Sequence, residues 1–213
     1  MKTITKITTQ LKSKRYNIFL DDEFLCGVEE DTLIKLGLKK GMKVSEEELA
    51  ALVKEERKHK CFNYALYLLN RQNYFEKVLV DKLKTKEYDE EEINFTLEKL
   101  RYYNYLDDSR LAQAFVNDKK RFSKKGPRYI KDALRSKGVS SDEINIAIEE
   151  NYSYEEAYEN ALVLLRKKYD YYNRKATDKY QLKGKLYAFL AGRGFSSDII
   201  KKVIDKVIEE NEE

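Results

Sequence analysis

The chain has 213 residues, of which 42% are hydrophobic and 38% charged, and its formal net charge is +4. One proline and eight glycines in the whole sequence favour helices and argue against a β-sandwich or barrel. There is no run of about 18 apolar residues and no signal-peptide pattern, so we expect no membrane association and a cytoplasmic protein.

The first 44 residues differ from the rest of the chain. Apolar and polar residues alternate over 16–20 and again over 24–28, on either side of an Asp-Asp pair, which predicts a β-hairpin. Threonine and isoleucine are frequent over 3–9, which can add a third strand. We expect this small sheet, followed by a short helix over 30–36, to cap the helical part or to offer an edge to a partner.

A long linking helix is predicted next, over about 45–72. Ser45 and Glu48 have the spacing of a capping box at its start. The stretch 54–60 is almost wholly charged, so we expect it to be solvated. The single histidine, His59, lies in this stretch and is expected to be an exposed helix residue rather than a catalytic base.

One eleven-residue pattern then occurs three times and predicts a helix, a tight turn and a second helix. In the copy Leu134–Ile144, Gly138 stands where a helix ends in a left-handed residue, and Ser140 with Glu143 can form a capping box for the next helix. Apolar residues on both sides of that cap have the positions of a hydrophobic staple. A helix–turn–helix unit is therefore predicted here.

The other copies are Leu83–Ile93 and Leu190–Ile200. Glu87 replaces the glycine in the first, which should cost that turn about 1–2 kcal/mol if the left-handed geometry is kept. Ile199 replaces the capping glutamate in the third. Three copies at a spacing of roughly 50 residues predict a mainly α protein of three tandem three-helix repeats in an elongated array, with the small N-terminal hairpin or sheet attached. The expected segments are the β-rich segment 1–44, the linking helix and first repeat 45–106, the second repeat 107–152 and the third repeat 153–213.

Few residues are suited to catalysis or to metal binding. Cys26 and Cys61 lack the spacing of a zinc site or a disulfide framework, and we expect both to be buried as small apolar side chains. The acidic runs 90–92 and 107–108 could be drawn as paired acids but are better explained by helix capping. No glycine-rich loop has the context of a phosphate site. We expect no enzymatic activity, no metal and no cofactor.

Charge is distributed unevenly. The stretch 119–137 holds nine basic residues and one acid, and further lysines and arginines follow among Tyr169, Tyr171, Tyr172 and Tyr180. The stretch 87–108 holds eight acids and two basic residues. A basic C-terminal half beside an acidic belt suggests a surface for nucleic acid, mainly single-stranded, or for a partner that carries nucleic acid. The alternative is a solvated helical face, with the tyrosines in a helical core.

The runs Tyr105–Asp108, Gly126–Val139 and Arg193–Ser196 resemble, in their order and spacing, motifs of the RecX family of regulatory proteins. The run Tyr105–Asp108 followed by Leu111, Ala112 and Phe115 is similar to the segment that opens the family's second repeat. The run from Gly126-Pro127-Arg128 through Lys137-Gly138-Val139 resembles its most recognisable motif, and Arg193-Gly194-Phe195-Ser196 resembles its third-repeat signature. Glu87, and Asn73-Tyr74 in the first repeat, depart from the family's pattern.

The resemblance implies a monomeric, non-enzymatic regulator of RecA recombinase. Such proteins lie along the groove of the RecA–DNA filament and limit filament growth, strand exchange and coprotease activity in recombination, DNA repair and the SOS response. The filament and its DNA are therefore the expected partners. The contact is expected to be led by Lys124, Lys125, Arg128, Lys131, Arg135 and Lys137, with Lys119, Lys120, Arg121, Lys183, Lys185 and Arg193 alongside them.

Two other functions stay open from the residues alone. A stand-alone DNA-binding protein would read bases with the second helix of a helix–turn–helix unit, but the helices that follow the three turns begin with acids or serine. A purely protein-binding scaffold would make the basic residues dispensable. Salt dependence of binding, with and without DNA, separates these two.

Overall fold

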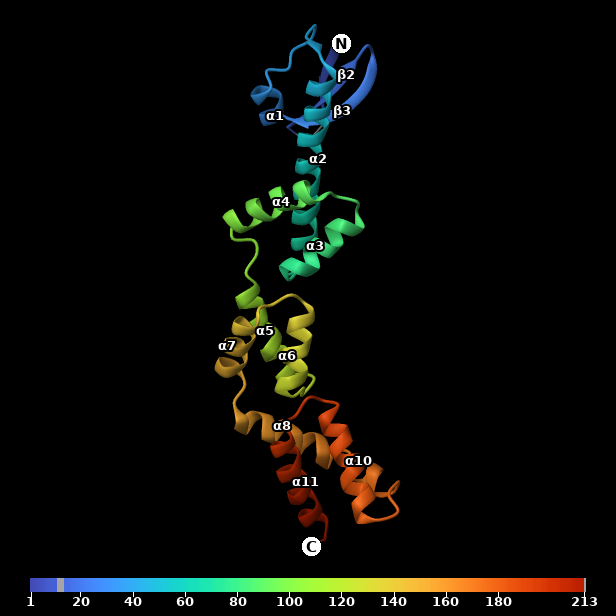
Figure 1. The fold of residues 1–213 in the computed structure, drawn as a ribbon, viewed down its shortest axis with the longest axis vertical. Coiled ribbons are helices and arrows are strands. Elements are labelled where there is room, and N and C mark those ends of the chain that lie inside the picture. The colour runs from blue at the N-terminus through green and yellow to red at the C-terminus, as the bar shows by residue number, and fades with distance from the viewer. Residues whose placement is uncertain (11–13, 213) are drawn as a thin grey trace. The chain divides into compact units, whose positions relative to one another are not determined.

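The computed structural model describes residues 1–10 and 14–212 and is mainly helical, with a small antiparallel sheet at the N-terminal end (Figure 1). The chain forms two compact units, residues 1–73 with 79–105 and residues 74–78 with 106–213. Tandem three-helix repeats and an N-terminal sheet confirm the predicted fold class. Within the described residues, no helix is long and apolar enough to cross a membrane.

The sheet has four strands in the order β3-β2-β1-β4. The predicted hairpin is β2 and β3, with Ile18 opposite Cys26, and the predicted third strand is β1. Alternating apolar residues give the sheet one buried face, which packs on Leu52 of the following long helix. The strands are β1 Lys2–Thr9, β2 Arg15–Leu20, β3 Glu23–Glu29 and β4 Lys43–Val44.

The helices of the first unit follow the sheet. The long helix α2 is continuous, and the predicted capping box is present, with Ser45 and Glu48 bonding each other's backbone N–H groups. Its first half covers the sheet, and α2 also packs against α4. Cys26 and Cys61 are both buried and free, as predicted, and burial raises the pKa of each thiol to about 11. The helices are α1 Glu30–Lys35, α2 Glu46–Leu69, α4 Glu90–Tyr102 and, from residue 79 onward, α3 Glu76–Thr85, whose first three residues belong to the second unit.

The prediction that 54–60 is solvated holds for Lys54, Arg57 and Lys60, whose side chains are about half exposed, but it is wrong for Glu56. The Glu56 side chain is 2% exposed and pairs with Arg15 of β2. On the other side of the helix, Arg57 binds Glu92 and Lys58 binds Glu91 at 2.8 Å, both on α4. The helix has the sheet on one side and α4 on the other, so charges that look exposed in sequence find partners from two different elements.

His59 is likewise not exposed, because its side chain is only 14% accessible. Its ring lies edge-on to Phe95, with centroids 6.1 Å apart, and faces Glu29 and Glu55 at 3.9 Å. Burial lowers the pKa of His59 despite the two carboxylates. The residue belongs to the packing between α2 and its neighbours.

The second unit holds the second and third repeats. In the second repeat the sequence predicts helices over about 108–122, 127–137 and 141–151, and the observed helices match these to within one residue. Pro127 occupies the first turn of α6, where its missing N–H is not needed. The third repeat contains an additional short helix, α9, where three helices were predicted. The helices are α5 Asp108–Arg121, α6 Pro127–Ser136, α7 Ser141–Asn151, α8 Tyr154–Arg166, α9 Tyr169–Asn173, α10 Lys179–Ala191 and α11 Ser197–Glu212.

The three predicted turns share one hydrogen-bond pattern. The N–H groups of Tyr88, Val139 and Phe195 each reach the carbonyl five residues earlier, at 3.4, 3.3 and 3.3 Å. The residue before each has a left-handed backbone, with φ of 60° at Glu87, 91° at Gly138 and 88° at Gly194. These are Schellman turns, and the first keeps the left-handed geometry without glycine.

Candidate binding surface

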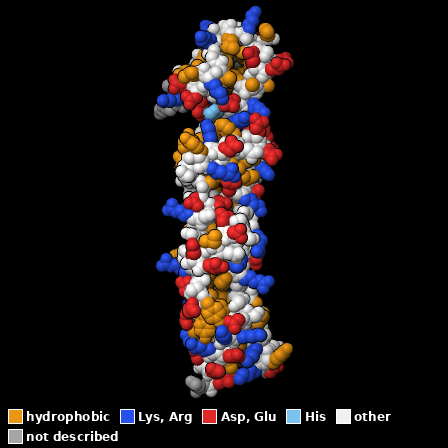
Figure 2. Space-filling view, turned by 60° about the vertical axis from the view of Figure 1, so that its left-hand side comes forward, with side chains coloured by type: hydrophobic (Ala, Val, Ile, Leu, Met, Phe, Trp, Pro, Cys, Tyr) orange, Lys and Arg blue, Asp and Glu red, His pale blue; other side chains and the backbone are white. Residues whose placement is uncertain are grey.

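The twelve basic residues predicted to meet a partner all lie in the second unit, on α5, α6 and α10 and the segments that follow them. On the face drawn in Figure 2, lysine and arginine side chains are interspersed with aspartate and glutamate rather than gathered in one field. The availability of each positive charge therefore depends on what its own side chain touches. By that criterion the twelve residues fall into three groups.

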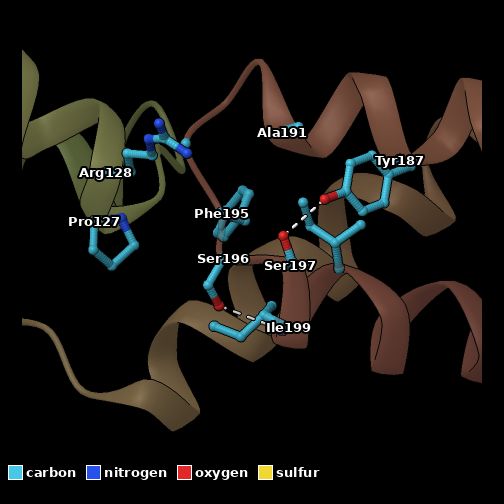
Figure 3. A pocket seen from close by; sticks show the side chains of 10 residues that line it. Pro127, Arg128, Tyr187, Ala191, Phe195, Ser196, Ser197 and Ile199 are labelled. Carbon is cyan, nitrogen blue, oxygen red and sulfur yellow. Dashed lines mark hydrogen bonds between the residues drawn. The ribbon is translucent and has the colours of Figure 1, made fainter.

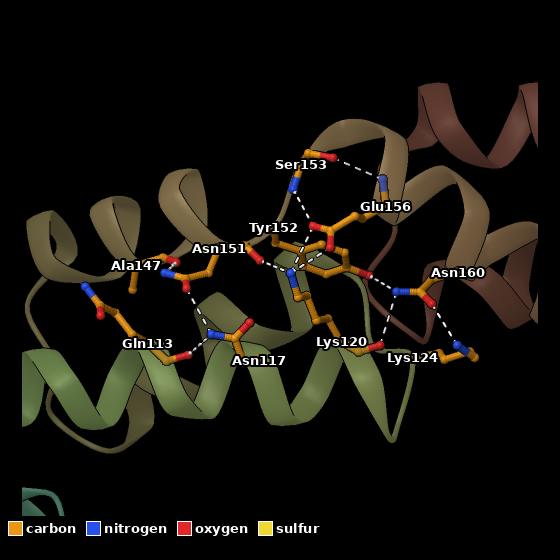
Figure 4. Close-up of polar contacts among 10 residues, drawn as sticks. All are labelled: Gln113, Asn117, Lys120, Lys124, Ala147, Asn151, Tyr152, Ser153, Glu156 and Asn160. Atoms are coloured by element: carbon orange, nitrogen blue, oxygen red, sulfur yellow. Dashed lines mark hydrogen bonds and ion pairs between the residues drawn. The ribbon is translucent and has the colours of Figure 1, made fainter.

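The first group supports the packing of the second repeat on the third. Lys120 donates to Glu156 at 2.7 Å and to the carbonyl of Asn151, and its side chain is only 13% exposed (Figure 4). Lys124, in the loop after α5, donates to Oδ1 of Asn160 at 3.0 Å. The bond from Lys120 lowers the pKa of the Glu156 carboxyl. These two lysines therefore have internal partners on α8 and at the end of α7.

A row of amides completes this contact (Figure 4). Asn117 bonds Asn151 at 2.9 Å, and Nδ2 of Asn160 donates to the hydroxyl of Tyr152 at 3.0 Å and to the Lys120 carbonyl at 3.1 Å. Burial raises the pKa of Tyr152. We did not predict this network, although a signal for it was present. Polar residues stand at helical spacing on one face of α5, at Gln113, Asn117 and Lys120, and Lys124 follows in the loop after it.

Arg193 also has an internal role. Its guanidinium donates to the carbonyl of Ser123 at 3.3 Å. Next to it the N–H of Gly126 donates to the Arg193 carbonyl at 2.8 Å, and the N–H of Arg128 donates to the Gly194 carbonyl at 3.0 Å. The two motif runs that look most like the family's signatures are thus joined backbone to backbone.

The second group pairs with neighbours at the surface. These contacts are exposed, and single exposed pairs contribute about 1 kcal/mol or less, so a partner's phosphate or carboxylate can replace them at small cost. The pairs are Lys119 with Asp118, Lys131 with Asn145, Arg135 with Asp132, Lys183 with Asp205, and Lys185 with the carbonyl of Lys175.

The third group consists of basic side chains that have no ion pair or side-chain hydrogen bond within the described part of the chain. Lys125 and Lys137 each lie over an aromatic ring, 3.9 and 5.6 Å from the ring centroid. Arg121 and Arg128 are exposed, and within the described part of the chain neither has an ion pair or a side-chain hydrogen bond. These four residues need give up little to bind an anionic partner.

The tyrosines of the third repeat divide in the same way. Tyr169 is buried in the core, and Tyr172 packs against Phe189 with ring centroids 5.6 Å apart. Tyr171 is 45% exposed and Tyr180 is 91% exposed. The alternative of a helical core therefore holds for two of the four, and only the other two are open to a partner.

Three acids of the runs 90–92 and 107–108, namely Glu92, Asp107 and Asp108, accept hydrogen bonds from backbone N–H groups at helix starts. Asp89 and Glu92 form a capping box, and Asp107 caps α5, as predicted. Asp108 differs from the expectation, because it accepts the Glu76 N–H at 3.0 Å and so caps α3 instead of its own helix. Burial raises the pKa of Asp108. Among the described residues, no group of three His, Cys, Asp or Glu side chains could hold a metal ion.

A pocket of about 320 Å³ opens where the start of α6 meets the turn between α10 and α11 (Figure 3). Pro127 and Arg128 stand on one side and Tyr187 and Ala191 on the other, with Phe195 between them. Most of its lining is apolar. Arg128 belongs to the predicted basic surface, whereas no pattern in the sequence points to Tyr187 or Ala191 of α10, which face it.

Family models match four consecutive parts of the chain. The N-terminal domain of regulatory protein RecX matches residues 2–45, and the first, second and third three-helix domains of RecX match residues 61–100, 107–148 and 154–204. These domains correspond to the sheet and to the three helical repeats described above.

Several relatives are similar over nearly the whole chain. Regulatory protein RecX of Leuconostoc mesenteroides is 38% identical over 100% of this chain and 79% of its own length, and that of Bacillus subtilis is 35% identical over 100% and 80%. A crystal structure of regulatory protein RecX has a TM-score of 0.81 at 31% identity, covering 96% of this chain and 100% of the other. RecX from Lactobacillus salivarius has a TM-score of 0.64 at 27% identity, covering 72% and 97%. Domain by domain and over its full length, this chain belongs to the RecX family of regulatory proteins.

Proposed function

We propose that the chain regulates RecA recombinase without catalysing a reaction. It binds along the groove of the RecA–DNA filament and limits filament extension, strand exchange and coprotease activity. The observation that carries the proposal is the full-length likeness to regulatory proteins RecX, which includes the N-terminal domain and all three helical domains.

The arrangement of the repeats suits a periodic partner. Three linked helical domains can contact several subunits of a filament at once, so contacts that are weak singly add up through effective concentration. The bound protein can then compete with the addition of the next RecA subunit to the filament. No step of this action needs a metal, a nucleophile or a general base.

We assign the leading contacts to the four residues that have no ion pair or side-chain hydrogen bond among the described residues, Arg121, Lys125, Arg128 and Lys137. The surface-paired lysines and arginines contribute around them. Lys120, Lys124 and Arg193 act mainly by holding the second repeat against the third, because their charged groups already have partners inside the molecule. This division differs from a simple reading of the basic stretch as one contact surface.

The first experiment follows DNA-dependent ATP hydrolysis by the RecA of the same organism on single-stranded DNA while this protein is added. We expect hydrolysis to fall at concentrations well below that of RecA, because a regulator that blocks filament growth acts substoichiometrically. Undiminished hydrolysis, together with tight binding to bare DNA, would instead identify a stand-alone DNA-binding protein.

The leading contacts are tested by charge reversal at Arg121 and Arg128. The double variant R121E/R128E should weaken binding to the RecA–DNA filament by about tenfold or more and reduce the salt dependence of binding, because two accessible cations are lost. The matched control is K39E/K40E, which makes the same change of charge at two exposed lysines of the first unit. Equal affinity and salt slope in both variants would exclude this surface and favour a protein-only scaffold.

A further inference from the structure

The pocket at the start of α6 is formed by two segments that are distant in sequence. Gly126 and Arg128 are held against the turn at Gly194 by two backbone hydrogen bonds of 2.8 and 3.0 Å, so its walls are fixed by main chain rather than by flexible side chains. On the α10 side, the hydroxyl of Tyr187 bonds Oγ of Ser197 at 2.7 Å, which holds the ring at the rim (Figure 3). The pocket is therefore preformed.

The floor of this pocket is apolar. Phe195, Ile199 and Ile200 are 3%, 3% and 1% exposed, and they form its base together with the exposed side chain of Ala191. A volume of about 320 Å³ is at the small end of the range for ligand pockets, and it suits one or two side chains better than a cofactor.

The rim carries one available charge. Arg128 lines the pocket, is exposed, and has no ion pair or side-chain hydrogen bond within the described residues. The nearest acid in sequence to the lining, Asp198, is already bound by the hydroxyl of Tyr154 and by Lys202 at 3.3 Å. An apolar hollow with a single uncompensated guanidinium at its edge is complementary to an apolar group that has one carboxylate beside it.

We infer that this pocket binds a short segment of a protein partner in which a large aliphatic or aromatic side chain stands next to an aspartate or glutamate. The apolar side chain enters the hollow between Pro127 and Ala191, and the carboxylate pairs with Arg128. This inference rests on the proposed function, since it names how the third repeat engages its protein partner. Pockets that anchor one apolar side chain beside a charge pair are frequent centres of protein interfaces.

Nucleic acid fits the same pocket less well. A single strand carries a negative charge at every nucleotide and is bound by grooves lined with many cations, whereas this pocket is lined by one. Its apolar floor offers no exposed aromatic face, because Phe195 is buried, and Tyr187 at the rim supplies a single ring rather than a series of rings on which successive bases stack. A peptide needs only one cation and one hollow.

Occupancy can be measured directly because the chain contains no tryptophan. The variant Y187W places the only indole at the rim of the pocket, and Y180W places it on the same helix at a side chain that is 91% exposed and outside the lining. The probes are overlapping 15-residue peptides without tryptophan that cover the RecA of the same organism. We expect peptides with an apolar residue beside an acid to shift the emission of Y187W but not that of Y180W.

Two further variants test the chemistry of binding. R128Q removes the charge, and it should weaken binding of those peptides by about tenfold, as expected for the loss of one charge-assisted hydrogen bond. A191W fills the hollow and should abolish binding. A188W adds the same bulk at an exposed alanine of α10 outside the lining, and it should bind as the unmodified protein does.

The inference is overturned if no peptide shifts the Y187W emission, if R128Q binds the peptides as tightly as the unmodified protein, or if a single-stranded oligonucleotide gives the shift instead. Binding of each variant to the intact RecA–DNA filament distinguishes a failure of this inference from a failure of the proposed function. If the filament binds the unmodified protein, A188W and A191W equally well, the pocket is excluded as a binding site, and the proposed regulatory function is retained. If the filament binds none of them, the proposed function itself fails.

Discussion

The turn between α3 and α4 and the turn between α10 and α11 have the same hydrogen bonds and different residues at the left-handed position. Glu87 closes the first, with φ of 60°, and its carbonyl accepts a hydrogen bond from Arg57 at 3.0 Å. Gly194 closes the second, and a Cβ added there would fall closer than 3.0 Å to the backbone of Tyr129. The turn at Glu87 requires only a left-handed backbone. The turn at Gly194 requires a left-handed backbone and also empty space where a Cβ would lie.

The comparison teaches that glycine at such a turn has two separable roles. The conformational role concerns the local backbone, where a side chain costs about 1–2 kcal/mol. The spatial role concerns the neighbouring repeat, whose main chain occupies the place of the missing Cβ. Gly138 is intermediate, because what approaches it is the side chain of Lys77 rather than backbone. Substitutions at the three turns should therefore differ in size in a defined order.

The largest effect is expected at the Gly194 junction. G194A should destabilise the protein by at least about 3 kcal/mol, since it combines a left-handed alanine with a collision against main chain that cannot rotate away. Gly126, whose Cβ would meet the Gly194 carbonyl, should behave similarly as G126A. Urea unfolding followed by far-UV circular dichroism measures both.

The control for this substitution lies in the same repeat. Gly184 is in α10 and has open space around the position of a Cβ, so G184A should stabilise the protein by roughly 0.5–1 kcal/mol. If G194A and G184A had similar effects, the close contact between the second and third repeats would be disproved.

A middle effect is expected at Gly138. G138A should cost about 2 kcal/mol, because the alanine keeps the strained φ of 91° and also displaces the stem of Lys77. Shortening that stem in K77A/G138A should recover only part of the steric cost, because it removes the Cγ and Cδ contacts but leaves the Cβ of residue 77 at 2.7 Å. A double-mutant cycle from thermal unfolding measures the coupling, and additive single effects would show that the two side chains do not compete for space.

The smallest effect, and the opposite sign, is expected at Glu87. E87G relieves about 1–2 kcal/mol of left-handed strain and adds roughly 0.5–1 kcal/mol of backbone freedom to the unfolded chain, so a gain of about 0.5–1 kcal/mol remains. E87A keeps the strain and serves as the control. A loss of stability in E87G measured by the same urea titration would mean that the Glu87 side chain makes a contribution that exceeds its strain.

Much of the fold could be predicted because its signals are local. The capping boxes at Ser45 and Ser140, the hairpin around Asp21 and the left-handed position at Glu87 each depend on residues a few positions apart. The additional helix α9 was not predicted, because it is a five-residue element without a capping signal of its own.

The candidate surface could be predicted only in outline. The basic stretch 119–137 was visible, but Lys120, Lys124 and Arg128 look alike in sequence and have different surroundings in the fold. The charged stretch 54–60 looked solvated and proved to lie between the sheet and α4. The pocket was missed because its two sides, Arg128 and Tyr187, come from different repeats.

The sequence by itself determined the repeats, their turns and the family, since helix caps and Schellman turns are satisfied by hydrogen bonds within a few residues. Tertiary structure decided which charges remain available. The partner of Lys120 lies 36 residues away and that of Arg193 lies 70 residues away, so neither contact exists until the second and third repeats pack together. Burial and pairing across that distance, rather than composition, distinguish Lys120 and Arg193 from Arg121 and Arg128, which are exposed and have no ion pair or side-chain hydrogen bond among the described residues.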